Sequence, residues 1–258
     1  MPHAAASGLP LVRRYEAAGF RAWPAARVRY DGTWVVRLTD RHPAKRLNSV
    51  NPLDPRDTAR VAERIGAVGA EFDAAGRALT FRLSPLSGAT LDGHLDAAGW
   101  SRFSESVVMD VAITPDLVQG AMDHIPLKEV GRFMDAVKPV HGLADAEADG
   151  LASVLASIRP NLGLFVLDRG AEPLATVVCV QDGDLAGLFE VATLEAERGM
   201  GHGRRAILAA LRWARLAGAR RAWLQVEADN HVAIGLYASL GFREVYRYHY
   251  RRPPETGA

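Results

Sequence analysis

The segment RGMGHGRR at residues 198–205 determines which folds the second half of this chain can adopt. It follows a strand predicted over residues 185–193 and opens a helix predicted over residues 203–217. Its glycines alternate with larger residues, so no Cβ shields the neighbouring backbone N–H groups. The first amides of a helix lack intrahelical partners, and the helix dipole favours an anion there. The segment therefore predicts a pyrophosphate-binding loop, and the alternative is a strand–helix turn with solvated arginines.

Two other kinds of phosphate loop do not fit this segment. A Walker A loop needs Gly-Lys-Ser/Thr, whereas Gly203 is followed by Arg204 and Arg205. A Rossmann loop has the spacing G-x-G-x-x-G after the first strand of its fold. Here the spacing is G-x-G-x-G, and other predicted strands precede it in the same half. Both nucleotide-binding folds are therefore disfavoured.

Predicted strands and helices are interleaved in both halves of the chain, which favours α/β or α+β layers. We expect helices over residues 11–20, 57–74, 91–98, 130–137, 144–158, 203–217 and 231–240. We expect strands over residues 27–30, 33–38, 79–83, 102–112, 161–168, 175–181, 185–193, 222–227 and 242–251. The proline-containing segment between the halves predicts a domain boundary. The predicted domains are residues 1–115 and 129–258, with a linker over residues 116–128.

Composition excludes several classes of function. The 258 residues include 31 basic and 30 acidic side chains, so a net charge of +1 disfavours nucleic-acid and anionic-membrane partners. Cys179 is the single cysteine, and no histidines show metal-ligand spacing, so we expect neither a disulfide nor a metal. Without a long apolar run or a signal-like start, we expect a cytoplasmic protein. Aromatic and basic residues alternate over residues 246–252, which could stack on RNA but favours a final strand with one face in the core.

Two motifs resemble the GNAT N-acetyltransferase superfamily. Residues 198–203 are similar to its R/Q-x-x-G-x-G/A loop, and residues 188–193 to its fourth strand. The later segment AWLQVEADNHVAIGLYASLGF, residues 222–242, contains N-x-x-A-x-x-x-Y-x-x-x-G-F at the separation found in that family. The resemblance covers about residues 130–250. It implies an α/β (α+β) fold with a mixed, splayed central sheet flanked by helices, and transfer of acetyl from acetyl-CoA to an amine.

The resemblance also implies where the cofactor lies. The pantetheine arm would fill the gap between the fourth and fifth strands, and the pyrophosphate would lie on the glycine loop. The implied cofactor contacts are Val191, Ala192, Thr193, Arg198, Gly199, Met200, Gly201, His202, Gly203, Arg204, Asn230 and Tyr237. Asn230 could bind the pantetheine, cap the helix over residues 231–240, or do both.

Tyr237 is the candidate general acid. It follows Asn230 by seven residues, about two helical turns, so both side chains face one cleft. A phenol with a pKa of about 10 can give its proton to a leaving thiolate of similar pKa. The alternative is a core aromatic beside Phe242.

The general base has three candidates. Some relatives carry a glutamate at the position of Gln225, and an amide cannot act as a base. Strand alternation places Glu190 opposite Val191, a parity that could bring its carboxylate into the cleft. Glu190 is therefore the first candidate, with Glu227 and ordered water as the others. The alternative role of Glu190 is a structural ion pair with an arginine.

The first half resembles a degenerate copy of the second, so the chain would hold two GNAT-like domains in tandem. Residues 91–103 and 233–245 match when Gly99 is placed on Gly241, which puts Leu95 at the position of Tyr237. The polar segment over residues 46–51 is either a loop or strand edge, or a contact to the acceptor.

The acceptor and the oligomeric state stay open. The acceptor could be a small-molecule amine or a peptide N-terminus, and the protein a monomer or a homodimer. The alternative to an enzyme is a non-catalytic acyl-CoA-binding sensor or scaffold.

Overall fold

The structure is a computed structural model that describes residues 8–254. The first half contains α1 (Leu9–Ala22), β1 (Arg27–Asp31), β2 (Trp34–Leu38), β3 (Ser49–Pro52), α2 (Val61–Ala74), β4 (Phe81–Leu83), α3 (Gly88–Ala97) and β5 (Ser101–Ala112). The second half contains α4 (Val130–His141), α5 (Asp145–Ser157), β6 (Asn161–Arg169), β7 (Glu172–Asp182), β8 (Leu185–Thr193), α6 (His202–Leu216), β9 (Arg221–Glu227), α7 (His231–Ser239) and β10 (Arg243–Arg252). The outer ends of both predicted domains, residues 1–7 and 255–258, lie outside the described residues.

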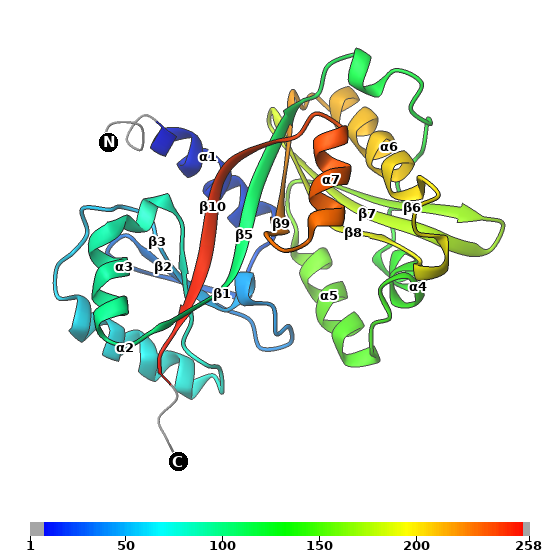
Figure 1. The fold of residues 1–258 in the computed structure, drawn as a ribbon. Helices are drawn as coiled ribbons and strands as arrows, with labels where there is room; N and C mark the ends of the chain where they lie inside the picture. The colour runs from blue at the N-terminus through cyan, green and yellow to red at the C-terminus, as the bar shows by residue number, and fades with distance from the viewer. Residues whose placement is uncertain (1–7, 255–258) are drawn as a thin grey trace.

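The strands form one mixed sheet of ten strands in the order β1-β2-β3-β4-β10-β5-β9-β8-β7-β6. The long strands β5 and β10 run antiparallel through its middle and link the two halves (Figure 1). β10, the last strand of the chain, lies between β4 and β5 of the first half. The sheet is therefore continuous across the predicted linker, which connects β5 to α4.

The two halves repeat one topology with their last strands exchanged. In each half the first three strands are antiparallel neighbours and the third pairs parallel with the fourth. A helix, α2 or α6, joins the third and fourth strands, and α3 or α7 precedes the fifth. The helix ends also match, since the Trp100 amide donates to the Leu95 carbonyl and the Phe242 amide to that of Tyr237. Gly99 and Gly241 adopt the positive φ that closes such an end, so the predicted internal match is confirmed.

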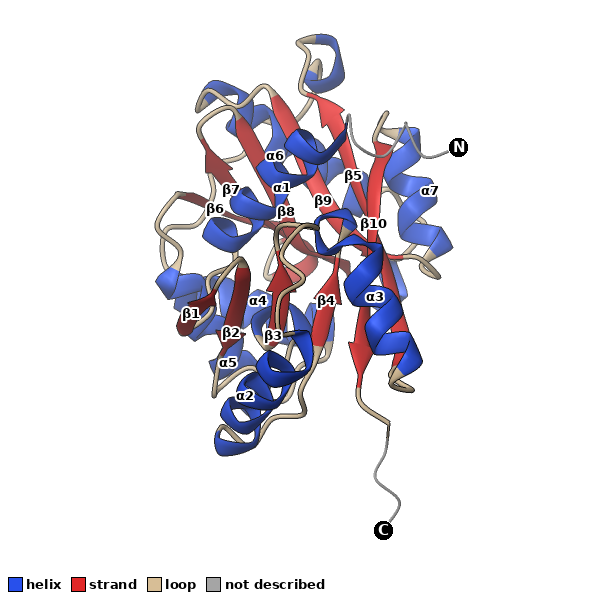
Figure 2. Cartoon of the chain, turned by 90° about the vertical axis from the view of Figure 1, so that its left-hand side faces the viewer, coloured by secondary structure: helices blue, strands red, loops and turns tan. Residues whose placement is uncertain are grey.

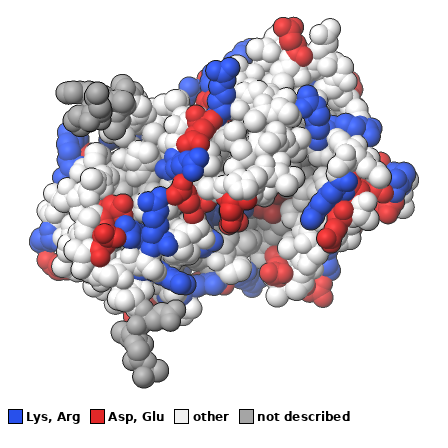
Figure 3. All heavy atoms as spheres, in the orientation of Figure 1, with Lys and Arg blue, Asp and Glu red and all other residues white. Residues whose placement is uncertain are grey.

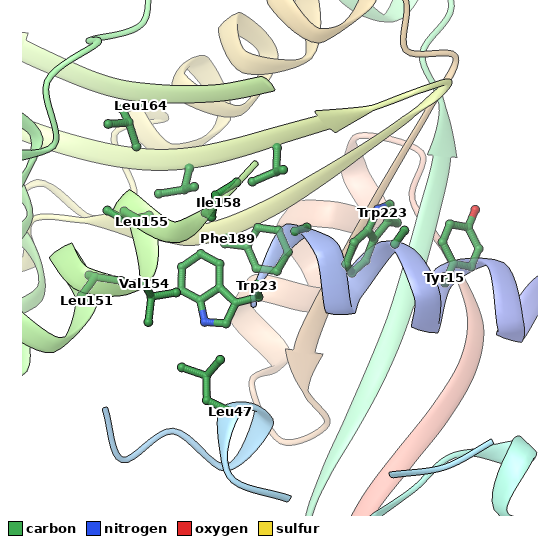
Figure 4. Close-up of a cluster of buried hydrophobic side chains, with 14 of the residues drawn as sticks. Tyr15, Trp23, Leu47, Leu151, Val154, Leu155, Ile158, Leu164, Phe189 and Trp223 are labelled. Atoms are coloured by element: carbon green, nitrogen blue, oxygen red, sulfur yellow. The ribbon is translucent and has the colours of Figure 1, made fainter. Parts of the chain in front are cut away.

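Helices cover both faces of the sheet (Figure 2). On one face α6 packs on β6, β7 and β8, and α1 and α4 pack on the other. Tyr15 and Ala18, one turn apart on α1, are buried with Trp23 after the helix. The Trp23 ring stacks on Phe189 of β8, 4.7 Å between centroids, and Tyr15 lies beside Trp223 of β9 (Figure 4). A helix from the first half of the sequence therefore completes the core of the second half.

The final strand has the one-sided burial that its sequence predicts. Tyr246, Tyr248 and Tyr250 are buried, while Arg247 is exposed and pairs with Glu244 and Glu105. Figure 3 shows acidic and basic side chains alternating along this part of the surface. The tyrosine rings are therefore core residues rather than a stacking platform. No helix within residues 8–254 is long and apolar enough to cross a membrane.

Candidate active site

β8 and β9 separate halfway along their length. Their parallel pairing runs from Leu185 opposite Arg221 to Leu188 opposite Leu224 and then stops. Beyond that point β8 stays paired with β7, and β9 with β5. The last residues of β8, including the predicted contacts Val191, Ala192 and Thr193, thus have a free edge toward β9. Such an edge can pair with an extended ligand as a further strand would.

A β-bulge redirects Glu190 at this opening. The register of β7 and β8 shifts between the pairs formed by Thr176 and Val178, and Glu190 has a φ of 47°. Positive φ is uncommon for a residue with a Cβ, and a bulge re-aims the side chains at its position. Glu190 therefore lies in the part of β8 that has separated from β9, and the bulge rather than simple strand alternation determines the direction of its side chain.

The glycine loop leads directly into α6, and its glycines serve different purposes. Gly199 and Gly201 have φ values of 81° and 80°, and neither would place a Cβ within 4 Å of another atom. These two glycines are needed for the positive φ of the backbone. Gly203 is needed for close packing, because a Cβ there would lie 3.0 Å from Thr193 Oγ1. Gly201 precedes the helix without a side-chain cap, so the first amides of α6 are available to an anion.

The side chains of the loop are not equivalent. Arg198 and Met200 are exposed, and Arg198 makes no ion pair within the described part of the chain. Arg204 Nη1 donates to the hydroxyl of Ser239 at 3.0 Å, which ties α6 to α7. His202 Nε2 lies 3.1 Å from Glu197 Oε2 and faces away from solvent. Arg198 is therefore the predicted cation most free to meet a ligand.

Tyr237 and Asn230 lie at the two ends of α7. Tyr237 is buried, 5.8 Å from the Phe242 ring, and belongs to the hydrophobic cluster on which Val191 packs. Burial raises the pKa of Tyr237 to about 12, so its phenol stays protonated in the neutral range. Asn230 Oδ1 accepts a hydrogen bond from the Ala233 amide at 3.0 Å and caps the helix. Both alternative structural roles are thus present, and neither prevents a role toward a ligand.

On the opposite face of the sheet, Glu190 lies between a cation and a histidine. Arg46 Nη2 donates to Glu190 Oε1 at 2.8 Å, and His141 Nδ1 lies 3.8 Å from Oε2. Thr176 fixes this arrangement, because its hydroxyl is 3.0 Å from His141 Nε2 and donates to the Glu190 carbonyl. Burial lowers the pKa of His141, so this imidazole is neutral at pH 7. Sequence reasoning missed His141, which has the pattern of an ordinary last-turn residue of α4.

Arg46 is the part of the polar segment 46–51 that reaches the site. Its guanidinium lies over the rings of Trp23, at 4.7 Å, and Phe189, at 5.8 Å. The amides of Asn48 and Asn51 are buried and hydrogen-bonded to the backbone of neighbouring segments. These asparagines therefore support a strand edge and not an acceptor contact, and only Arg46 faces Glu190.

A cleft of about 360 Å³ opens beside Arg46, between the segment of residues 44–46 and the strands β5, β9 and β10. It is lined by Lys45, Arg46, Ser106, Gln225, Glu227 and Tyr248, among others. The Tyr248 hydroxyl donates to Gln225 Oε1 at 3.0 Å, so this amide is held in place. Glu227 is exposed at the rim, 4.0 Å from Lys45 Nζ. Both halves of the chain therefore contribute to one cleft.

Comparison with known proteins agrees with this geometry. Residues 134–242 match the acetyltransferase (GNAT) family. Over 249 residues the chain is 25% identical to the uncharacterized N-acetyltransferase YobR of Bacillus subtilis (strain 168), covering 93% of this chain and 98% of that protein. A GCN5-related N-acetyltransferase from Kribbella flavida has a TM-score of 0.68 at 18% identity, covering 97% of this chain and 96% of that one. A tandem GNAT protein from the clavulanic acid biosynthesis pathway has a TM-score of 0.61 at 15% identity, covering 92% and 86%.

These comparisons confirm the predicted fold class, two GNAT-like units with a mixed and splayed sheet. The family match spans the opening between β8 and β9, the glycine loop and α7. The individual residue roles stay predictions. Residues 134–242 are therefore similar to the GNAT family of acetyltransferases, and the chain as a whole has the fold of GNAT proteins.

Proposed function

We propose that this protein transfers an acetyl group from acetyl-CoA to a primary amine by direct attack. The observation that carries the proposal is the opening between β8 and β9, with an uncapped glycine loop at its end. The absence of a Cβ at Gly203 lets the start of α6 pack closely against Thr193, so the loop lies next to the free end of β8. Val191, Ala192 and Thr193 would hold the pantetheine, and the loop from Arg198 to Arg204 the pyrophosphate.

Acetyl-CoA supplies an activated thioester, and the surrounding residues provide the rest of the chemistry. Backbone amides of the free β8 edge are suited to stabilise negative charge on the thioester oxygen. Tyr237 stays protonated in the neutral range, which a proton donor to the departing sulfur requires. Its buried position in the hydrophobic cluster on which Val191 packs keeps water away from that proton.

Proton removal from the amine is assigned to Glu190 with His141 behind it. The ammonium has to lose a proton before nitrogen can attack. Glu190 is held by Arg46 on one oxygen, and its other oxygen lies 3.8 Å from Nδ1 of His141. Glu227 lies exposed at the rim, which makes it the weaker candidate.

Calorimetric titration with acetyl-CoA tests the proposal most directly. We expect micromolar affinity for the wild type and loss of at least a hundredfold in Gly201→Glu, which puts a negative side chain at the start of α6. Gly218→Glu is the matched control, because Gly218 lies just after the same helix with a φ of 107° and equally open space. The control should keep wild-type affinity. Absent binding in the wild type, or equal loss in both variants, would contradict a cofactor site at this loop.

A further inference from the structure

The acceptor face of the sheet holds more positive charge than its carboxylates neutralise. Arg82 and Glu16 form a buried ion pair, and the Tyr246 hydroxyl donates to Glu16 Oε1 at 2.6 Å. Arg37 is equally buried but donates to the carbonyls of Arg46 and Trp23, and within residues 8–254 it makes no direct ion pair with a carboxylate. Burial, followed by repulsion from Arg82, lowers the pKa of Arg37 to about 9, which leaves it charged at pH 7.

A small cavity of about 20 Å³ lies among these cations and extends to Arg46. Three arginines and one carboxylate line it, Arg37, Arg46, Arg82 and Glu16, together with Phe189, Gln225 and other residues. Nε of Arg37 and Nε of Arg82 are buried without a hydrogen-bond partner in residues 8–254. Such unsatisfied donors favour an acceptor of negative character nearby, because donors left unpaired in a low-dielectric site are costly.

Arg46 carries this positive potential to the accessible cleft. Its side chain is 29% exposed and that of Glu190 is 17% exposed, so both can meet a ligand. Lys45 lies on the same wall, with Nζ 2.8 Å from Ser104 Oγ and over the Phe103 and Tyr250 rings. A ligand whose only charge is an ammonium would compete with Arg46 for the Glu190 carboxylate. The repulsion between the two cations is stronger at a partly buried site than in water.

We infer that the acceptor is a zwitterion of the amino-acid type, whose amine faces Glu190 and whose adjacent carboxylate binds Arg46. This inference rests on the proposed acetyl transfer and names its substrate class. A carboxylate matches the planar guanidinium through paired, charge-assisted hydrogen bonds. The Arg46–Glu190 pair is thus complementary to a ligand that presents the opposite charges side by side. Tyr248, Tyr250 and Val226 line the remaining cleft and leave room for the ligand's side chain.

The inference excludes two other classes of amine. Polyamines and aminoglycosides carry several positive charges and offer nothing to Arg46, Lys45 or Arg37. A peptide N-terminus lacks a carboxylate beside its amine, because the first carbonyl is an amide. These classes should therefore be poor acceptors.

Thiol release from acetyl-CoA, measured with a matched panel of amines, tests the inference. The panel contains the protein amino acids, the carboxamide of each, spermidine and kanamycin. We expect turnover with at least one amino acid and a kcat/KM at least tenfold lower for its carboxamide, which keeps the amine and side chain. Better turnover with spermidine, kanamycin or a carboxamide, or none with any amino acid, overturns the inference.

Substitution of Arg46 assigns the selectivity to this residue. In Arg46→Gln we expect KM for the amino acid to rise at least tenfold and the preference over the carboxamide to fall toward one. Arg46→Lys should restore part of that preference. Arg41→Gln is the matched control, since Arg41 is exposed in the same connection and makes no ion pair within residues 8–254. An unchanged preference in Arg46→Gln contradicts the inference.

Calorimetry with acetyl-CoA separates this failure from failure of the proposed function. Intact affinity in both the wild type and Arg46→Gln, combined with the wrong amine preference, contradicts the acceptor class alone. Absent affinity in the wild type contradicts acetyl transfer itself. A melting curve for Arg46→Gln verifies that the variant is folded.

Discussion

The two repeats differ in the connection that leads from the third strand to the next helix, which is β3 to α2 in the first half and β8 to α6 in the second. In the second half, Gly199 and Gly201 precede α6, Gly203 lies in its first turn, and no side chain caps its first amides. In the first half, Asp57 occupies the turn before α2, where it accepts hydrogen bonds from the Thr33 amide and hydroxyl and pairs with Arg64. The helix-initiating residue is left-handed in both, Gly201 in one and Arg60 in the other.

This difference shows how one topology can either leave the start of a helix open to a ligand, as at α6, or fill it with side chains, as at α2. A carboxylate and a guanidinium fill the turn of the first repeat, so a ligand phosphate has no access. Leu95, fully buried, also stands at the position of Tyr237. The first repeat instead contributes Lys45, Arg46 and Ser106 to the cleft that β9 of the second repeat also lines.

Of the substitutions that test this comparison, removal of the carboxylate at the β8 bulge should lower kcat the most. In Glu190→Gln we expect kcat to fall about a hundredfold, because the amide keeps a hydrogen bond to Arg46 but cannot accept a proton. Affinity for acetyl-CoA should change less than threefold. Glu227→Gln, at the exposed rim, should lower kcat less than fivefold. A reversed order of the two effects would move the base to Glu227.

Removal of the Tyr237 hydroxyl should have the next largest effect on kcat, because the first repeat has Leu95 at this position. Tyr237→Phe is expected to lower kcat at least tenfold at unchanged acetyl-CoA affinity, since the ring still packs beside Phe242. Steady-state kinetics with calorimetry on the same samples measure both quantities. Tyr30→Phe on β1, a largely exposed position, is the matched control. Wild-type turnover in Tyr237→Phe would leave that side chain with its packing role only.

The sequence predicted the local features of the site better than its long-range contacts. The glycine loop, the strand before it and the end of α7 depend on short-range backbone preferences, so residues 185–242 were sufficient. The helix predicted from residue 57 begins instead at Val61, because Asp57 is used as a hydrogen-bond acceptor in the turn. Local propensity could not reveal that tertiary use.

The acceptor side depends on contacts between residues far apart in the sequence. Arg46 and Glu190 are 144 positions apart in the sequence. β10 pairs with β4 and β5, although most of the second half lies between them in the sequence. The bulge at Glu190 breaks the alternation on which sequence reasoning depends. His141 acquires its significance solely from the carboxylate opposite it. Such pairings follow from packing, and no periodicity in one segment encodes them.

The smallest expected effect on catalysis comes from the turn before α2, which Asp57 and Arg64 fill. A substitution there should change the free energy of unfolding but not kcat. Asp57→Asn keeps an acceptor for Thr33 but removes the charge opposite Arg64, whose side chain is 9% exposed. We expect the free energy of unfolding to fall by about 1–3 kcal/mol, with acetyl-CoA affinity and kcat within twofold of wild type. Denaturant titration measures the loss. Asp40→Asn, which removes one partner of an exposed ion pair with Arg27, should cost less than about 0.5 kcal/mol.

The pH dependence of this stability difference tests its electrostatic origin. Burial raises the pKa of Asp57, but hydrogen bonds from Thr33 and the Arg64 guanidinium outweigh it and hold the pKa below its usual range. A carboxylate with a lowered folded-state pKa stabilises the fold above the unfolded pKa near 4 and loses that contribution as pH falls. The difference between wild type and Asp57→Asn should therefore be constant from pH 5 to 8 and shrink below pH 4. A difference that persists at pH 3 would assign the effect to packing, and a loss of cofactor affinity in this variant would mean that the two ends of the sheet are coupled.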